Sequence, residues 1–484
     1  MKNALSIALS LCITPHVFAQ DMSQLWSERC ASCHGEAAQG NDTTKSLLSL
    51  EKMAQELDRP FYESIKPGLK SVDGHAFLDL DNSQAWGLIV HLRELQSRHA
   101  RGKLIPARAN DGVYESGGHQ YRVETVVKKG LEVPWGIEFM PDGRAIVTER
   151  QGTVRIWSGG AEPGPVVEGI PAVVQAGQGG LLDVALHPEF ASNKWVYLAY
   201  NAQLADGGRR TMTKVVRGRI AEKDGVFTWG DQETIFECKP EHGIASGLHF
   251  GSRMDFQRSN QDGRFYIYFA IGERGNAPHA QDRKRPNGKV HRLWDNGEVP
   301  SDNPFVNEPD AYHSIWSYGH RNPQGLVFGV DGTLWDTEHA PRGGDELNVV
   351  EKGRNYGWPL VSFGINYNDS ALKTPWPDLE GGSVASANIK MPAWRWLPSI
   401  AVCGLAVYRA NGDSGFPNWH GDLFAGGLAG SVVDRIKVKD GAMVERESIL
   451  LGKGRVRDVQ QGIDGCLYVL LESPGRIVKI SPAQ

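Results

Sequence analysis

The sequence predicts a mainly β protein in which a six-bladed β-propeller follows a small all-α domain. Three observations predict this arrangement. The 484 residues include 57 Gly, 26 Pro and 14 Trp, a turn-rich composition that is typical of many short strands and unfavourable for long helical bundles. A strand–turn–strand pattern recurs six times between residue 121 and the C-terminus, as in a repeat architecture. Before residue 103, two helix-like stretches flank a loop-rich segment.

The composition also excludes several classes of protein. A chain of this length exceeds what one hydrophobic core supports, so two or more domains are expected. The net charge of -5 argues against a nucleic-acid-binding surface, which would be basic. The charged fraction of 23% and the hydrophobic fraction of 40% are those of a folded chain. No segment after the first residues approaches the ~18 consecutive apolar residues of a membrane-spanning helix, so none is expected.

Residues 1–19 are interpreted as a signal peptide. They begin with a short positive segment, residues 4–18 are mostly apolar, and Val17 and Ala19 suit a small-residue cleavage site. The apolar run is too short for an N-terminal anchor helix. We therefore expect an exported protein, and the brevity of the leader suits a bacterial periplasm.

Cys30, Cys33 and His34 form a C-x-x-C-H motif, the attachment signature of c-type haem. Two thiols at this spacing lie on one helical turn and can add to the two vinyl groups, while the adjacent imidazole reaches the iron. A zinc knuckle would need a second cysteine pair nearby, and a thioredoxin-like dithiol would need a βαβ setting. With its two flanking helices, the segment 20–102 resembles a minimal cytochrome c domain.

The sixth ligand of the haem iron is an open question in the sequence. Cytochromes of this class usually place a Met some forty residues after the proximal His. Here that position carries His75. Met53 is the only well-placed thioether in the domain, but it comes early in the chain. We expect His34 and His75 to hold the iron. A solvated loop histidine is the alternative interpretation of His75.

Residues 103–120 are polar and Gly-rich without a hydrophobic period, which predicts a linker. The segment 121–484 then holds the six repeats. Most of them contain a tight Asp-Gly turn between two strands, as at Asp142, Asp262 and Asp464. Roughly 60 residues per repeat suit four-stranded propeller blades with long inserted loops. An eight-stranded sandwich is the alternative.

Nine short strings occur in order on the loops between these repeats. They are Val133-Pro-Trp-Gly, Gly177-Gln-Gly-Gly-Leu-Leu, His249-Phe-Gly-Ser-Arg, Ser317-Tyr-Gly-His-Arg-Asn-Pro-Gln-Gly, Pro341-Arg-Gly-Gly-Asp-Glu-Leu-Asn, Asn355-Tyr-Gly-Trp-Pro, Gly364-Ile-Asn-Tyr, Pro398-Ser-Ile-Ala and Arg455-Val-Arg-Asp-Val. The strings resemble those of the soluble glucose and sorbosone (aldose sugar) dehydrogenases that depend on pyrroloquinoline quinone (PQQ). The resemblance covers nearly all of residues 130–482.

The resemblance implies a PQQ pocket on these loops. PQQ is a planar tricarboxylate, so its site must supply cations, a divalent metal and a flat clamp. By position in the family's motifs, the residues that line the pocket are Gln178, Arg321, Asn322, Tyr367, Arg455 and Arg457.

The resemblance also implies calcium. The family binds it through the backbone carbonyls of a Gly-Pro pair, which here is Ala340-Pro341. A carbonyl ligand tolerates this change if the backbone needs no positive φ. Glu346 and Tyr356 match a second calcium site, through a carboxylate and a carbonyl, and Asp345 is placed to orient the first of them. A purely structural turn is the alternative.

His249 is the general base that the resemblance implies, taking the proton of the sugar C1 hydroxyl while hydride passes to PQQ. A neutral imidazole suits proton abstraction near pH 7. Arg321 would stabilise the charge that develops on the quinone oxygen.

Four positions depart from the family's pattern. Leu248 stands where an acidic or amide residue often precedes the base, so a hydrogen bond that orients the imidazole is lost or comes from elsewhere. Ala429 replaces a lysine, Glu273 stands where Asp is usual, and Cys403 stands where Ser is common. The sequence does not determine whether Cys403 pairs with Cys238 or Cys466.

Taken together, the sequence predicts an exported quinohaemoprotein. It would oxidise an aldose from the C1 hydroxyl to the lactone with PQQ and calcium, and pass the electrons through haem c to an external acceptor such as a soluble cytochrome. The alternative is a non-enzymatic propeller that binds sugars or proteins beside an electron-transfer cytochrome, which Leu248 and Ala429 would favour. Oxidation of a non-sugar alcohol or aldehyde by the same site is a third interpretation.

Overall fold

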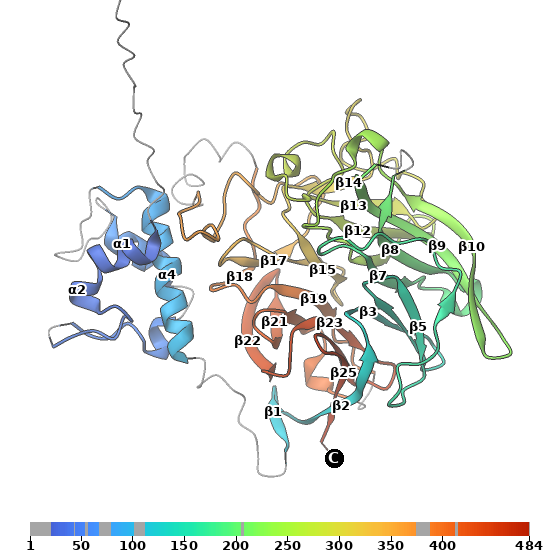
Figure 1. Ribbon diagram of the computed structural model, residues 1–484, viewed down its shortest axis with the longest axis horizontal. Coiled ribbons are helices and arrows are strands. Elements are labelled where there is room, and N and C mark those ends of the chain that lie inside the picture. The colour runs from blue at the N-terminus through green and yellow to red at the C-terminus, as the bar shows by residue number, and fades with distance from the viewer. Residues whose placement is uncertain are drawn as a thin grey trace, which may run out of the picture.

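The structure is a computed structural model that describes residues 21–42, 44–53, 57–66, 79–100, 112–204, 208–373, 388–411 and 415–483. A helical unit near the N-terminus, blue in Figure 1, lies beside a ring of six β-sheets. The predicted signal peptide, residues 1–19, and the candidate iron ligand His75 lie outside the described residues.

The helical unit consists of α1, α2, α3 and α4, with a 3₁₀ turn between α2 and α3. Asp21 begins α1 by accepting from the backbone N–H of Ser23 at 2.8 Å. Asp81 and Gln84 begin α4 with reciprocal side-chain to backbone bonds of 2.7 and 2.9 Å, a capping box. Both helices confirm the predicted ones. The elements are α1 (Met22–Arg29), α2 (Ala31–His34), η1 (Leu50–Met53), α3 (Asp58–Ile65) and α4 (Asn82–Ala100).

Helices α1 and α4 pack against each other through apolar side chains. Met22, Leu25 and Trp26 of α1 and Trp86 and Ile89 of α4 belong to one buried cluster. Burial of these faces stabilises helices that would be marginal in isolation. Within the described part of the chain, no helix combines the length and apolar character needed to cross a bilayer.

Six sheets form the propeller, which confirms the predicted six blades. Blade 1 has β3 (Pro134–Phe139), β4 (Ala145–Glu149) and β5 (Thr153–Trp157); blade 2 has β6 (Val167–Glu168), β7 (Leu181–Leu186), β8 (Val196–Gln203), β9 (Thr211–Lys223) and β10 (Val226–Phe236); and blade 3 has β11 (Met254–Arg258), β12 (Phe265–Ile271), β13 (Lys289–Trp294) and β14 (Ile315–Tyr318). Blade 4 has β15 (Pro323–Phe328), β16 (Leu334–Glu338), β17 (Asp345–Val349) and β18 (Trp394–Trp396); blade 5 has β19 (Val402–Val407), β20 (Leu423–Gly427), β21 (Val432–Lys439) and β22 (Ala442–Leu451); and blade 6 has β23 (Val456–Gln461), β24 (Leu467–Glu472) and β25 (Gly475–Pro482). Short helical turns α5 (Phe190–Asn193), η3 (Pro240–His242), η4 (Ala277–Ala280) and η7 (Pro417–Trp419) lie in the loops.

The two ends of the propeller chain close the ring in blade 6. Strand β2 (His119–Leu131) pairs antiparallel with β25, so that Tyr121 faces Pro482. Strand β1 (Tyr114–Ser116) pairs with β2 and lies inside the predicted linker 103–120, so the sheet begins within that segment and not at its end. Closure leaves few exposed strand edges, the usual benefit of a propeller.

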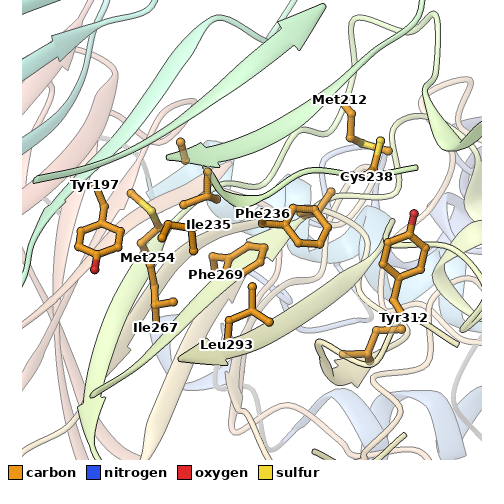
Figure 2. Packing of buried hydrophobic residues seen from close by; sticks show 14 of the residues in the cluster. Tyr197, Met212, Ile235, Phe236, Cys238, Met254, Ile267, Phe269, Leu293 and Tyr312 are labelled. Atoms are coloured by element: carbon orange, nitrogen blue, oxygen red, sulfur yellow. The ribbon is translucent and has the colours of Figure 1, made fainter. Parts of the chain in front are cut away.

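Apolar side chains fill the spaces between neighbouring blades. Figure 2 shows the cluster between blades 2 and 3, in which Tyr197 and Phe236 face Ile267, Phe269 and Leu293. All five cysteines that the structure describes are unpaired. The open question about disulfides is thereby answered, because Cys238, Cys403 and Cys466 are buried and unbridged.

The helical unit packs on loops of the propeller near blade 4. The Trp86 indole N–H donates to the carbonyl of Phe363 at 2.9 Å. The Arg342 guanidinium donates to both carboxylate oxygens of Glu94, at 2.7 and 2.6 Å. Phe363 also joins the buried cluster of the helices, so helical unit and propeller share part of one core.

Candidate active site

All but one of the expected pocket residues lie where the inner strands of the propeller begin, and Tyr367 lies in the loop between β17 and β18. Gln178 precedes β7, His249 precedes β11, Asn322 directly precedes β15 and Arg455 directly precedes β23. The inner strands contact one another around the ring, so their first residues gather at one end of the central channel. The structure therefore brings together side chains that are far apart in the sequence.

His249 is held from both sides. Its backbone has a left-handed φ of 50°, and its N–H donates to the side-chain oxygen of Gln178 at 2.9 Å. Its ring Nδ1 hydrogen-bonds with the carboxylate of Glu273. This contact replaces the orienting partner that Leu248 cannot supply.

Burial lowers the pKa of His249, with Glu273 acting in the opposite direction and Arg321 in the same one. The imidazole is therefore neutral at pH 7. With Nδ1–H donated to the carboxylate, Nε2 carries the free lone pair, which is the arrangement that a general base needs.

Arg321 and Asn322 join this histidine to blade 4. The backbone N–H of Arg321 donates to Glu338 at 2.6 Å, and its Nη1 donates to the carbonyls of His339 and Ala340, each at 3.0 Å. The amide oxygen of Asn322 accepts from the backbone N–H of Gly251 at 3.2 Å. The loop of the base and the loop of Arg321 are thus one hydrogen-bonded assembly.

Arg457 lies on the channel wall at blade 6. Its Nη1 donates to the side-chain oxygen of Gln324 at 3.0 Å and contacts the thiol of Cys403 at 3.3 Å. Its Nη2 forms a 2.9 Å ion pair with Glu472. Among the described residues, the buried Nε atoms of Arg321 and Arg457 have no hydrogen-bond partner, so two cationic N–H groups lack an acceptor.

The pocket residues divide into a floor and a rim. His249, Arg321, Asn322 and Arg457 are buried and form the floor. The rim residues are exposed; they are Gln178, Arg455 and Tyr367, the last of which is 74% exposed.

The comparisons with known proteins fit this geometry. The model of the Glucose / Sorbosone dehydrogenase family matches residues 131–479. The chain belongs to this family. Aldose sugar dehydrogenase YliI of Escherichia coli (strain K12) is 41% identical over 361 residues, which are 74% of this chain and 92% of the relative.

Solved structures of aldose sugar dehydrogenases share the fold. The apo-form of the soluble enzyme from Escherichia coli superposes with a TM-score of 0.67 at 39% identity, covering 75% of this chain and all of that one. The PQQ-bound form of the enzyme from Streptomyces coelicolor has a TM-score of 0.57 at 27% identity, over 75% of this chain and 98% of that one. The family match covers the propeller, and helices α1 to α4 lie outside it.

The calcium candidates of this family member lie on the loop between β16 and β17 and beyond it. Ala340 has no left-handed φ, so the replacement of Gly is tolerated there. Buried Asp345 accepts from the backbone N–H of Ala340 at 3.1 Å and from that of Val402 at 2.9 Å. It therefore holds the carbonyl-bearing loop in place. Burial raises the pKa of Asp345 to about 6.

The second pair of calcium candidates lies on β17 and on the loop after it. Asn348 donates to Glu346 at 3.3 Å, and burial raises the pKa of Glu346 well above its ordinary value. The Tyr356 hydroxyl accepts from the backbone N–H of Glu351 at 2.8 Å. A partly desolvated carboxylate of this kind is stabilised by a hard cation.

Sequence reasoning missed three residues that contact the floor. Gln324 contacts Arg457, Glu338 holds the backbone of Arg321, and His339 lies 3.4 Å from the amide of Asn322. Burial lowers the pKa of His339 to about 3. Gln324 lies inside one of the nine strings, and Glu338 and His339 directly precede Ala340-Pro341. Their closeness in sequence to those strings was the signal that could have identified them.

A second candidate site is the C-x-x-C-H motif of the helical unit. Cys30 ends α1 and caps α2, which carries Cys33 and His34. The backbone N–H of His34 donates to the Cys30 carbonyl at 2.9 Å, so both thiols and the imidazole lie on one turn. The Trp26 ring is 6.3 Å from that of His34.

Proposed function

We propose that the protein is a PQQ-dependent dehydrogenase that oxidises the C1 hydroxyl of an aldose to the lactone. One observation carries the proposal. A neutral His249, oriented by Glu273, lies in the same hydrogen-bonded assembly as Arg321. Two relatives support the proposal. One is named an aldose sugar dehydrogenase, and the other is a structure of an aldose sugar dehydrogenase in its PQQ-bound form.

The floor of the pocket suits PQQ. The guanidinium groups of Arg321 and Arg457 each keep a buried Nε–H without an acceptor among the described residues, and carboxylate oxygens are strong acceptors for such groups. When bound, the quinone would accept hydride from the sugar carbon. Asn322 and the rim residues Gln178, Tyr367 and Arg455 complete the set that would hold it.

The protein's own catalytic work is a proton transfer. Nε2 of His249 takes the proton of the sugar hydroxyl, while Nδ1 keeps its bond to Glu273. The carboxylate stabilises the imidazolium as it forms and prevents ring rotation. Arg321, which lowers the pKa of His249, favours return of the proton to solvent.

Calcium would be held by the carbonyls of Ala340 and Pro341. The Ala340 carbonyl already accepts from Arg321, which shows that it is turned toward the pocket's cationic groups. Glu346 and the Tyr356 carbonyl would hold a second ion. Both sets consist of oxygen ligands, which calcium prefers.

We also infer that Cys30 and Cys33 attach haem c, and that His34 and His75 ligate its iron. Both thiols are unpaired, as attachment requires. Export by residues 1–19 to the periplasm would expose the protein to a soluble cytochrome as electron acceptor. The contacts of α4 with Phe363 and Arg342 favour electron transfer between two units held at high effective concentration.

Reconstitution tests the central proposal. Apo-protein is loaded with PQQ and calcium and assayed for dye reduction with aldoses, non-sugar alcohols and aldehydes. Sugar-dependent reduction supports a sugar dehydrogenase, and reduction with alcohols alone assigns a different substrate. Sugar binding by calorimetry without any reduction would instead make the propeller a binding module.

The haem proposal has an independent test. Haem should stay attached to the denatured wild-type polypeptide and be lost from a Cys30→Ser, Cys33→Ser variant. Two imidazole ligands give a low-spin iron, so His75→Ala should become high-spin and gain affinity for carbon monoxide. An unchanged low-spin spectrum would assign the sixth position to Met53 or another residue.

A further inference from the structure

Three buried side chains meet behind the loop that carries Arg321. They are His320, which follows β14, and Asp336 and Glu338 of β16. One ligand atom from each lies within 4.8 Å of the others. The exposed fractions are 0% for His320 and Asp336 and 4% for Glu338, so bulk solvent does not reach this cluster.

The sheet register explains why these groups share one face. Asp336 and Glu338 are two residues apart on β16, so both side chains project from the same face. In the antiparallel ladder Asp336 faces Asn348 of β17, which adds an amide to that face. Nδ1 of His320 lies 2.9 Å from Glu338 and 3.4 Å from Asp336.

Several oxygen atoms of the cluster lack a well-formed hydrogen bond. Among the described residues, no hydrogen bond of good geometry reaches either carboxylate oxygen of Asp336 or the amide oxygen of Asn348. The polar groups nearest to Asp336 are the His320 ring, at 3.4 Å, and the side chain of Asn348. Both side chains are fully buried. Buried polar atoms are nearly always satisfied, because leaving them bare costs several kcal/mol in an apolar setting.

The imidazole of His320 is fixed so that Nδ1 faces the carboxylates. Its Nε2 is 2.8 Å from the hydroxyl of Ser317, and its ring stacks on that of Tyr356 with centroids 4.4 Å apart. A proton on Nδ1 satisfies Glu338 only. A dication instead satisfies Asp336 as well, and two carboxylates with one neutral imidazole balance its charge.

We propose that His320, Asp336 and Glu338 bind a first-row transition-metal dication, with the amide oxygen of Asn348 completing the set. Imidazole favours zinc and its neighbours over calcium, which takes oxygen ligands alone. The site is therefore chemically distinct from the calcium candidates on the same blade.

The metal would support the cofactor pocket from behind. The second oxygen of Glu338 accepts the backbone N–H of Arg321 at 2.6 Å. A metal that fixes this carboxylate thereby fixes the position of Arg321. Because the three ligands are buried, the ion would enter during folding.

Metal content tests the proposal without reference to sugar oxidation. The full-length protein is dialysed against excess Ca²⁺, which replaces ions at oxygen-only sites, and its metals are counted by mass spectrometry. We expect one equivalent of a transition metal per chain in addition to any haem iron. Loss of outer-shell partners costs ~10–100-fold in affinity, so Asp336→Asn, which removes a ligand charge, should weaken Zn²⁺ binding by more than that.

Glu351→Gln is the matched control, since it neutralises a carboxylate that pairs with Lys390 and contacts none of the proposed ligands, so it should keep the transition metal. If Asp336→Asn does not fold, Co²⁺-substituted wild-type protein still reports the site, because its absorption and X-ray absorption spectra should show one imidazole nitrogen among oxygen ligands. A chain without a stoichiometric non-haem metal that also takes up no Zn²⁺ when refolded in its presence would overturn the proposal. So would a metal retained in both Asp336→Asn and Glu338→Gln, or a spectrum with oxygen ligands only.

Discussion

The imidazole of His249 depends on groups that the sequence places far from it. Glu273 lies 24 residues further on and Gln178 lies 71 residues earlier. Together they fix the ring's tautomer through a side-chain bond and its position through a backbone bond. The left-handed φ of 50° at His249 is a conformation that costs energy in a non-Gly residue and that surrounding contacts must maintain.

Replacing His249 by Ala should lower turnover by ~10²–10⁴, the usual worth of general acid–base catalysis. PQQ should still bind, because Arg321 and Arg457 are unaffected. Stopped-flow reduction of the PQQ-loaded variant by sugar measures the effect. Turnover like that of the wild-type protein would remove His249 from the base role.

The pH dependence of the reaction should report the depressed pKa of His249. The base is active when neutral, so kcat/KM should rise with pH through a pKa below the ordinary ~6.5 of histidine and be constant near neutrality. Glu273 raises this pKa against the effect of burial. Glu273→Gln should therefore move the acid limb to lower pH and also reduce the plateau. A limb that moves to higher pH would contradict the assigned pair.

At the scale of elements, the inner strands decide which loops meet. Each of the six repeats contributes an inner strand, and the site residues Gln178, His249, Asn322 and Arg455 lie just before four of these strands. The loop between β16 and β17 is tied to the start of β19, because Asp345 accepts from the N–H groups of both Ala340 and Val402. The first pair of calcium candidates, Ala340 and Pro341, thus lies on a loop whose shape two blades maintain.

Removal of calcium should release PQQ or abolish activity, and added calcium should restore both. The proposed ligands, the carbonyls of Ala340 and Pro341, are oxygen atoms, which favour a hard cation such as Ca²⁺. Filtration of chelated protein, with free PQQ measured by absorbance, follows the release. Full activity at a verified absence of metal would count against both calcium sites.

At the scale of the whole molecule, the helical unit is coupled to the pocket's edge. Arg342, which directly follows Pro341, pairs with both Glu94 of α4 and Asp369 at 2.7 Å or less. Its backbone pairs with Ile365, close to the rim residue Tyr367. Arg342 therefore links the helical unit, the loop between β16 and β17, and the segment that carries the rim residue Tyr367.

Glu94→Gln should weaken this attachment by about 1 kcal/mol, the upper value for partly exposed ion pairs, or about fivefold in the docked population. Hydrogen exchange of the amides in residues 363–371 measures the change. Arg98→Gln is a matched control, since its 3.4 Å contact with the same Glu94 is largely exposed. Equal effects of the two substitutions would contradict a specific role for Arg342.

The sequence by itself determined the repeat architecture and the loops of the site. Six strand–turn–strand units need a ring to bury their apolar faces, and the nine strings mark the loops that meet at one end of it. The two helices that flank the loop-rich segment before residue 103 were also predictable, because helical periodicity is a local property.

Only the tertiary structure decided which side chains meet across blades. The bond between His249 and Glu273, the division of the pocket into a buried floor and an exposed rim, and the pairing of Glu94 with Arg342 join segments separated by 24 to 248 residues. Sequence spacing sets which face of a strand a residue occupies, as for Asp336 and Glu338, because the alternation is a backbone property. It does not set which loop lies opposite, since that depends on closure of the ring and on the packing of the helices against it.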